Sequence, residues 1–367
     1  MPKELKDQDF ADWLGEIRGA TSSRELLAAR NKRQKIVNKS LVSMAVEEGN
    51  RQIAQIHREV MCRALTLCEA TCIQEGLGPP PVPYAFIALG SAGREEQTLW
   101  SDQDHALVIG AGDGQQVDFY YERFAAILVR ILEEAGYPPC PGKVMISNPL
   151  WRRTLASWQQ MLSDWREELG WEQVRYLMIA ADMRLITGDA GLFAQLRANI
   201  DEVLGSSAEH EQDLVLAVLR GTVRHKAALN VLGQVITERN GEHAGDFDVK
   251  YGLYLPIVNA VRFLAVEHGV VSSNSTLDRL RRLYELEALP FRWIEMCREA
   301  FIIALKFRSL AAGYEGENGL LTGSNYLPQA MLKQREIRRE LQEALGTVKL
   351  IYRSLERQRR YAERIWS

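Results

Sequence analysis

The spacing of hydrophobic residues predicts that the first part of the chain is helical. Between residues 53 and 67, apolar side chains recur every three or four positions, which is the period of one buried helix face. They are Ile53, Ile56, Val60, Ala64 and Leu67. The glycine and proline run at residues 76–83 stops this helix and forms a stiff extended connector. We therefore expect an N-terminal helical region over residues 1–78.

This apolar face has two candidate partners, the rest of its own domain and a second copy of the chain. A dimeric coiled coil usually needs three or four heptads, and the pattern here lasts only about two. Packing within the domain is therefore the favoured interpretation, and a homodimer stays an open alternative.

The next segment has the pattern of a small α/β domain over residues 79–150. Its first apolar run stops abruptly at Gly90-Ser91, as a buried strand does when it enters a tight turn. The expected elements are a strand at 84–89, a short helix at 94–99, a second strand ending at Ile109, a helix at 117–135 and a third strand at 143–147. Few strands with helices between them are typical of a small α/β fold.

After residue 150, glycine and proline become rare and helical periodicity dominates. The predicted helices cover residues 151–168, 171–186, 190–204, 208–238, 252–268, 276–287, 290–312 and 328–363. Short turns join them, so residues 151–367 should form a helical domain. The expected fold class is α+β: a mainly helical chain with a small α/β domain and a C-terminal helical bundle.

Composition narrows the classes of protein. The 367 residues are 46% hydrophobic and 25% charged, with a net charge of -3, so nucleic acid and anionic membranes are not expected partners. The first 18 residues lack the apolar core of a signal peptide, and no apolar run approaches the length of a membrane span. We expect a cytoplasmic protein. Its five cysteines show no CxxC pair, which indicates free thiols rather than zinc ligands or disulfides.

The first candidate binding element is the glycine turn after the first strand. The segment GSAGREE contains neither the Walker lysine nor the GxGxxG spacing. Gly93 keeps the backbone bare where a ligand could approach, and the first amides of the short helix suit an anion. Ser91 and the amides around Gly93 could hold the β- and γ-phosphates of a nucleotide.

The second candidate element is the pair Asp102 and Asp104. Being two residues apart on an extended backbone, their carboxylates lie on one face. Two such oxygen ligands beside a phosphate site suit Mg²⁺. The metal would neutralise charge while an acceptor hydroxyl attacks the α-phosphoryl group and pyrophosphate leaves. His105 alternates to the opposite face and should be packed or exposed rather than catalytic.

Two arginines have more than one interpretation. Arg94 could contact a phosphate or pair with Glu95 or Glu96. Arg262 lies on an otherwise apolar helix and needs an anionic partner, which could be Asp246, Asp248 or a phosphate. The C-terminal helix is basic but interleaved with glutamates, so a solvated face is favoured over RNA binding.

These motifs carry a resemblance to a known family. GSxGRxEQ followed by SDQD resembles the nucleotidyltransferase superfamily of the DNA polymerase beta type, and most closely a bacterial nucleotidyltransferase family often joined to CBS or cyclic-nucleotide-binding domains. That family is similar to the uridylyltransferase of PII signal proteins and the adenylyltransferase of glutamine synthetase. Further matching segments are FYYERFAAILVRILEEAGYPPCPGKVM, SNPLWRRTLASW, ADMRLITGD and FDVKYGLYLPIVNAVRFLA.

The resemblance implies a nucleotidyltransferase that depends on Mg²⁺, or on Mn²⁺, and uses ATP or UTP as donor. The acceptor would be a hydroxyl on a signalling protein. The resemblance implies metal binding by Asp102 and Asp104. The nucleotide-binding residues would be Gly90, Ser91, Gly93, Arg94 and Ser101.

One departure from the superfamily leaves the activity open. A third carboxylate usually comes from a later strand, and residues 143–147 contain none. Asp182, in ADMRLITGD, is the best catalytic replacement, with Asp246 or Asp248 as alternatives. If none of them reaches the metal, the chain would be a catalytically decayed nucleotide-sensing regulatory module. A tRNA nucleotidyltransferase or polymerase relative is disfavoured by the negative net charge.

Overall fold

Contacts within the computed structural model divide the chain into two compact units, each described by itself. Unit 1 comprises Met1–Gln159, Met183–Leu196 and Tyr314–Thr322, and unit 2 comprises Gln160–Asp182, Arg197–Gly313 and Gly323–Ser367. The structure describes residues 14–112, 114–205, 211–224, 228–229, 234–311, 314–315 and 321–365. The predicted N-terminal helical region thus belongs to the same unit as the predicted α/β core.

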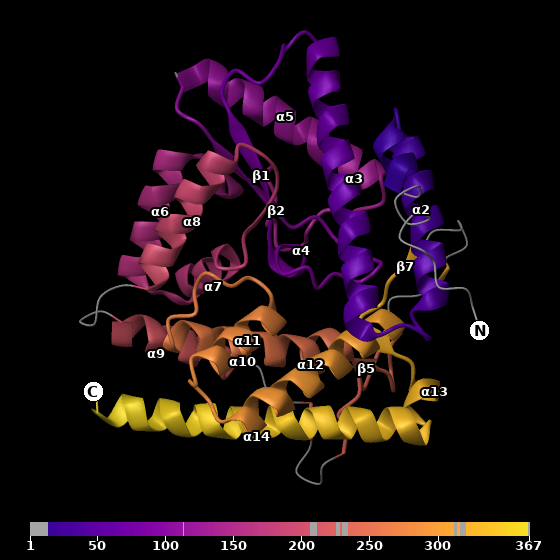
Figure 1. The fold of residues 1–367 in the computed structure, drawn as a ribbon, viewed down its shortest axis with the longest axis vertical. Helices are drawn as coiled ribbons and strands as arrows, with labels where there is room; N and C mark the ends of the chain where they lie inside the picture. Colours follow the sequence, from indigo (N-terminus) through magenta and orange to yellow (C-terminus); the bar gives the residue numbers. More distant parts are fainter. Residues whose placement is uncertain are drawn as a thin grey trace. The chain divides into compact units, whose positions relative to one another are not determined.

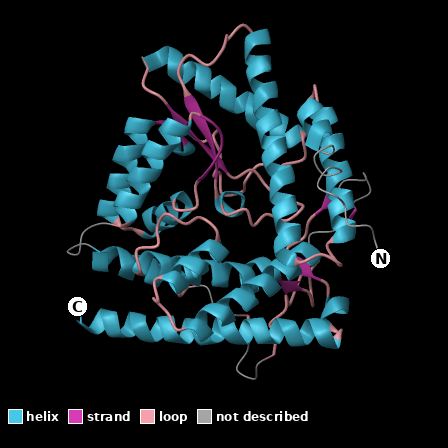
Figure 2. Ribbon diagram, in the orientation of Figure 1, coloured by secondary structure: helices cyan, strands magenta, loops and turns pink. Residues whose placement is uncertain are grey.

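A four-stranded mixed sheet is the centre of unit 1, in the order β3-β2-β1-β4. Its strands are β1 (Tyr84–Ala88), β2 (His105–Ile109), β3 (Arg152–Thr154) and β4 (Arg184–Gly188). The central strand β1 is antiparallel to both β2 and β4, whereas β2 and β3 are parallel. Strands are few and short beside the helices (Figure 2), which confirms the α+β class.

Two of the four strands lie where the sequence had predicted other elements. The third strand expected at residues 143–147 is wrong, because that segment forms turns in which Lys143 has a φ of +53°. The third and fourth strands lie instead at the start and end of ranges expected to be helical, 151–168 and 171–186. Each is short and flanked by helices, so pairing with β2 and β1 outweighs its local helical pattern.

Helices α2 (Ser23–Ser40), α3 (Val46–Gln74) and α5 (Gly114–Glu134) form the core of unit 1 with the sheet (Figure 1). The α3 helix packs on both α2 and α5. Four residues of the predicted apolar face are buried there, namely Ile53, Ile56, Val60 and Ala64. The interpretation that this face packs within its own domain is confirmed.

The remaining elements are mostly helices. They are α4 (Gly90–Gly93), η1 (Pro149–Trp151), α6 (Leu155–Glu168), α7 (Trp171–Ala180), α8 (Ala190–Leu204), α9 (Glu211–Thr222), the π-helix η2 (Lys250–Tyr254), α10 (Leu255–Glu267), α11 (Thr276–Glu285), α12 (Phe291–Ala311), α13 (Gln329–Leu332) and α14 (Arg335–Ile365). Two small antiparallel pairs join β5 (Phe247–Asp248) to β8 (Tyr326–Leu327) and β6 (Tyr314–Glu315) to β7 (Leu321–Thr322).

In unit 2, α10 packs against α9, α11 and α12, and α14 packs against α12 (Figure 1). The helix predicted over residues 208–238 ends at Thr222, and parts of that range lie outside the described residues. Among the helices that the structure describes, none combines the length and apolar character needed to cross a membrane.

A buried histidine on α3 connects the core to the loop that follows α4. The ring of His57 donates from Nε2 to the carbonyl of Thr98 at 2.8 Å, so its Nδ1 accepts from the hydroxyl of Tyr137 at 2.7 Å. Burial lowers the pKa of His57 to about 3, and the charge of Arg30 acts in the same direction. The ring is therefore neutral at physiological pH and holds Thr98 in place.

This histidine predicts a loss of stability in mild acid. Its folded-state pKa of about 3 lies below the ordinary value of 6.5, so between these values only the unfolded chain takes up the proton. The stability present above pH 6.5 should fall as the pH is lowered, by about 1.4 kcal/mol per pH unit for this one group. Urea unfolding at several pH values should show this fall.

The variant His57→Gln should have a smaller pH dependence, because the titrating ring is gone. Val60→Ala, a buried change on the same helix, is the control and should lower stability by a similar amount at every pH. If His57→Gln kept the pH dependence of the wild type, the loss of stability in mild acid could not be attributed to His57.

Candidate functional site

The glycine turn forms the α4 helix immediately after β1. Leu89 is extended, with φ -122° and ψ 175°, and the amide of Gly93 donates to its carbonyl at 2.9 Å. The short helix expected at residues 94–99 is therefore placed wrongly, because it starts at Gly90 and ends before Glu95, which has a φ of +57°. The amides at its start belong to the glycine turn itself.

Gly90 lies directly against one of the two predicted metal ligands. Its φ is +54°, and a Cβ atom at this position would lie 2.8 Å from Asp104 Oδ2. Glycine is therefore required twice, by the left-handed backbone and by the space that the carboxylate occupies. The structure brings these two predicted site residues together.

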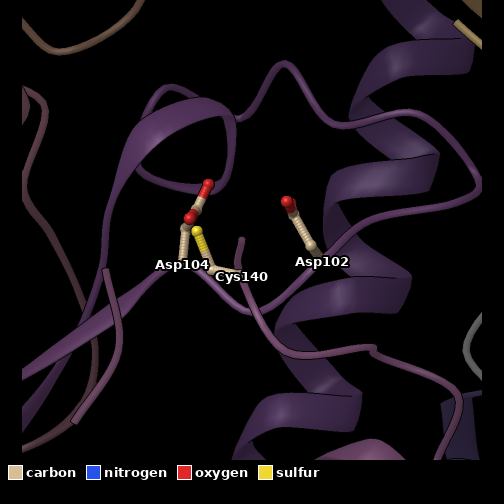
Figure 3. Close-up of side chains that lie close together, drawn as sticks. All are labelled: Asp102, Asp104 and Cys140. Atoms are coloured by element: carbon tan, nitrogen blue, oxygen red, sulfur yellow. The ribbon is translucent and has the colours of Figure 1, made fainter. Parts of the chain in front are cut away.

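A third side chain, Cys140, lies close to Asp102 and Asp104 (Figure 3). The sequence had not suggested it as a site residue. One carboxylate oxygen from each aspartate and the Cys140 sulfur lie within 4.8 Å of one another, and all three side chains are half-buried. Burial, together with the neighbouring Asp104 carboxylate, raises the pKa of the Cys140 thiol to about 12. This grouping can hold a divalent metal ion.

Gln103 and His105, the two residues on either side of Asp104, hold this segment in place at the start of β2. Gln103 donates from Nε2 to the carbonyl of Tyr137 at 2.9 Å, and its backbone amide donates to Pro138 at 3.0 Å. His105 accepts at Nδ1 from the amide of Ile146 at 3.2 Å, so its Nε2 donates to Gln103 Oε1 at 3.1 Å. Burial lowers the pKa of His105 to about 3. His105 is fully buried, so of the two expected alternatives it is packed rather than exposed.

Two predicted nucleotide-binding side chains make local contacts. Arg94 forms a buried ion pair with Glu96, with 2.7 Å between Nε and Oε2. The hydroxyl of Ser101 accepts from Gln97 at 2.9 Å and donates to the carbonyl of Asp102 at 3.2 Å. Their contacts to a nucleotide stay predictions, as does that of Ser91.

Arg184 is a charged residue beside the turn that the sequence did not identify. It comes from β4, where it pairs with Ala88 of β1. Its Nε donates to the carbonyl of Gly93 at 2.9 Å, and its Nη1 lies 3.5 Å from Glu95 Oε1. The β-branched run before Gly188 was a weak signal of a strand, but strand pairing alone brings this arginine to the turn.

Asp182, predicted as the third carboxylate, is buried in unit 2 between two arginines. Arg262 Nη2 donates to its Oδ2, and Arg279 Nη2 donates to its Oδ1 at 2.9 Å. Asp182 is therefore an anionic partner of Arg262, where the predicted alternatives were Asp246, Asp248 or a phosphate. Those two accept backbone amides instead, of Gln329 and Tyr251 respectively, each at 2.9 Å. The catalytic role of Asp182 stays a prediction.

A glycine turn in direct contact with one of two convergent carboxylates is typical of enzymes that bind a metal and a nucleotide. Two family models match the chain. One, described as Putative nucleotidyltransferase DUF294, covers residues 32–171, and the other, described as Putative nucleotidyltransferase substrate binding domain, covers residues 212–358. The chain belongs to this nucleotidyltransferase family, which confirms the family inferred from the motifs. No curated protein matches the chain.

The contact between Gly90 and Asp104 gives the first test of the site. Gly90→Ala would place a methyl group 2.8 Å from Asp104 Oδ2 at a positive φ, so the carboxylate must move. We expect the affinity for divalent metal to fall about tenfold or more, measured by isothermal titration calorimetry. Gly346→Ala, where a Cβ meets nothing within 4 Å, is the control and should keep the wild-type affinity. Equal metal affinities for the wild type, Gly90→Ala and Gly346→Ala would show that the contact between Gly90 and Asp104 does not affect metal binding.

The ion pairs of Asp182 give the second test. Asp182→Asn keeps the shape but leaves Arg262 and Arg279 without their shared carboxylate, so unfolding should require about 3 kcal/mol less free energy. Asp164→Asn, on the exposed side of α6, should be nearly neutral. Denaturant unfolding tests the role of Asp182 in the ion pairs, and metal titration tests its predicted role as the third metal-binding carboxylate. Wild-type stability combined with weaker metal binding would support the third-carboxylate role instead.

Proposed function

We propose that the protein transfers a nucleoside monophosphate from ATP or UTP to a hydroxyl group, with release of pyrophosphate. The observation that carries this proposal is the convergence of Asp102 and Asp104 beside Gly90, at the end of β1, in a member of a nucleotidyltransferase family. Positioning of the phosphates and compensation of their charge can supply most of the rate in such transfers.

The backbone of the α4 turn is the proposed site for the triphosphate. Gly90 and Gly93 carry no side chains that would keep the β- and γ-phosphates away, and Ser91 adds a hydroxyl donor. Arg94 supports this turn through its ion pair with Glu96, and Ser101 supports the backbone of Asp102. Arg184, bonded to the carbonyl of Gly93, adds positive charge near the turn.

The carboxylates of Asp102 and Asp104 fit a divalent ion such as Mg²⁺ or Mn²⁺, since both are half-buried and point to one side of the chain (Figure 3). When bound, such an ion would neutralise negative charge on the donor phosphates. The two aspartates thus orient the donor, and Gly90 leaves room for the carboxylate of Asp104.

A protein of a signalling pathway is the proposed acceptor. The model described as a substrate binding domain covers residues 212–358, so we assign recognition of the acceptor to the helices of that range, α9 to α14. The proposal of a protein acceptor also rests on the likeness to the PII uridylyltransferase and the glutamine synthetase adenylyltransferase.

A nucleotide-sensing module with a decayed site is the second candidate. The observation in its favour is Asp182, whose two carboxylate oxygens both accept from arginines. A site with two carboxylates could bind a nucleotide without turning it over. The two candidates differ in pyrophosphate release, which only the enzyme would show.

Substitution of the two aspartates tests the enzyme directly. The protein is incubated with each labelled nucleoside triphosphate, divalent metal and a cell lysate, and both labelled protein and pyrophosphate are measured. Asp102→Asn and Asp104→Asn should each lower transfer about a hundredfold or more, because each removes an anionic ligand of the metal ion that would compensate the charge of the phosphates.

Asp118→Asn, on an exposed position of α5, is the control and should retain full activity. Transfer that survives both active-site substitutions would refute the assignment of these aspartates. Nucleotide binding by the wild type, with no labelled protein under any donor, would favour the sensor.

A further inference from the structure

We propose that the Cys140 thiolate is the third metal ligand of this site, and that the resulting set of two carboxylates and one sulfur selects a divalent transition-metal ion over Mg²⁺. The inference rests on the proposed function, because it places the metal at Asp102 and Asp104. It assigns the third ligand position to Cys140 rather than to another carboxylate.

The geometry of the three side chains carries the inference. Their ligand atoms lie within 4.8 Å of one another, and Figure 3 shows the Cys140 sulfur beside the carboxylate of Asp104, with the carboxylate of Asp102 near them. Small side-chain rotations bring such atoms to the distances of a bound ion, about 2.3 Å for sulfur and about 2.0–2.2 Å for carboxylate oxygen in the case of Zn²⁺. Within the part of the chain that the structure describes, this is the one group of three acidic, histidine or cysteine side chains that converges in this way.

The backbone around Cys140 is held in this position by several hydrogen bonds. Gln103 binds the carbonyls of Tyr137 and Pro138, just before the cysteine. After it, the amide of Lys143 donates to the carbonyl of Cys140 at 2.9 Å, and the amide of His105 donates to the carbonyl of Val144 at 3.1 Å. Residues on both sides of Cys140 are thus tied to Gln103 and His105, which flank Asp104 at the start of β2, so the sulfur is positioned by the fold.

The chemistry of the donors sets the preference for the metal. Mg²⁺ is a hard ion that takes oxygen ligands in octahedral geometry. A thiolate instead favours softer ions such as Zn²⁺ and Co²⁺, and two carboxylates beside it remain suitable for them. Coordination would release the thiol proton to solvent and form one metal–sulfur bond.

The other described cysteines lack this setting. Cys62, Cys68 and Cys72 lie on α3, and Cys297 is buried on α12. None of them belongs to a converging group of three candidate ligands among the described residues. Cys62 is half-buried, as Cys140 is, and therefore serves as the matched control.

The wild-type full chain can be tested without a variant. The protein is loaded with one equivalent of Co²⁺ or Zn²⁺ in the absence of nucleotide. Co²⁺ should give a sulfur-to-metal charge-transfer band in the near ultraviolet, and X-ray absorption of the Zn²⁺ form should show one sulfur at about 2.3 Å. A first shell of oxygen and nitrogen alone, or no binding of either ion, would overturn the proposal.

Variants then assign the sulfur. Cys140→Ser and Cys140→Ala should both abolish the Co²⁺ band and raise the Kd for Co²⁺ about tenfold or more, while the Kd for Mg²⁺ stays the same. Cys62→Ser should keep both the band and the affinity. A band that persists in the Cys140 variants, or an equal loss of Mg²⁺ and Co²⁺ affinity, would overturn the assignment.

These readouts separate this inference from the proposed function. A band that depends on Cys140, in a protein that transfers no nucleotide, would support the ligand and refute the enzyme. Nucleotide transfer with Mg²⁺, in a protein that shows no sulfur ligand, would support the enzyme and refute the ligand.

Discussion

The hydrogen bonds of Gln103 and His105 hold the candidate site together. These two side chains face the core of unit 1, where they bind the backbone of the loop that follows α5. Because neighbouring residues on an extended chain alternate in direction, this arrangement turns Asp102 and Asp104 to the other side. A buried hydrogen bond contributes about 1 kcal/mol, and leaving one of its partners unsatisfied costs more. The buried side chains of Gln103 and His105 therefore determine where the carboxylates of Asp102 and Asp104 point.

The N-terminal helices support the same site from another direction. Gln34 on α2 donates to the carbonyl of Leu99, and two residues of α3, Asn50 and His57, donate to the carbonyls of Glu95 and Thr98. The three acceptors belong to the loop between α4 and Asp102, which is largely buried and must have its polar backbone groups satisfied. Helices α2 and α3 thus support the loop that joins the glycine turn to Asp102 and Asp104, and they belong to the same structural unit as these residues.

The parts of the site that depend on local rules could be predicted from the sequence. The shared face of Asp102 and Asp104 follows from the two-residue period of a strand, and the glycine turn follows from an apolar run that stops at Gly90. Residues that reach the site through long-range pairing could not be found in this way. Cys140 arrives through the hydrogen bonds of a loop, and Arg184 through the pairing of β4 with β1. Neither contact leaves a periodic signal near its residue.

Aspartate side chains have different surroundings in the two units. The charge of Asp182 is compensated by the buried guanidinium of Arg279, which is only 2% exposed, and by the half-buried guanidinium of Arg262, and this suits a structural ion pair. Asp102 and Asp104 lie half-buried beside a bare glycine and a thiol, a setting that suits a divalent cation from solvent. A carboxylate whose two oxygens already accept from arginines, as those of Asp182 do, is less suited to binding a further cation. The contacts of Asp182 thus suit a structural role, whereas Asp102 and Asp104 remain the predicted metal ligands.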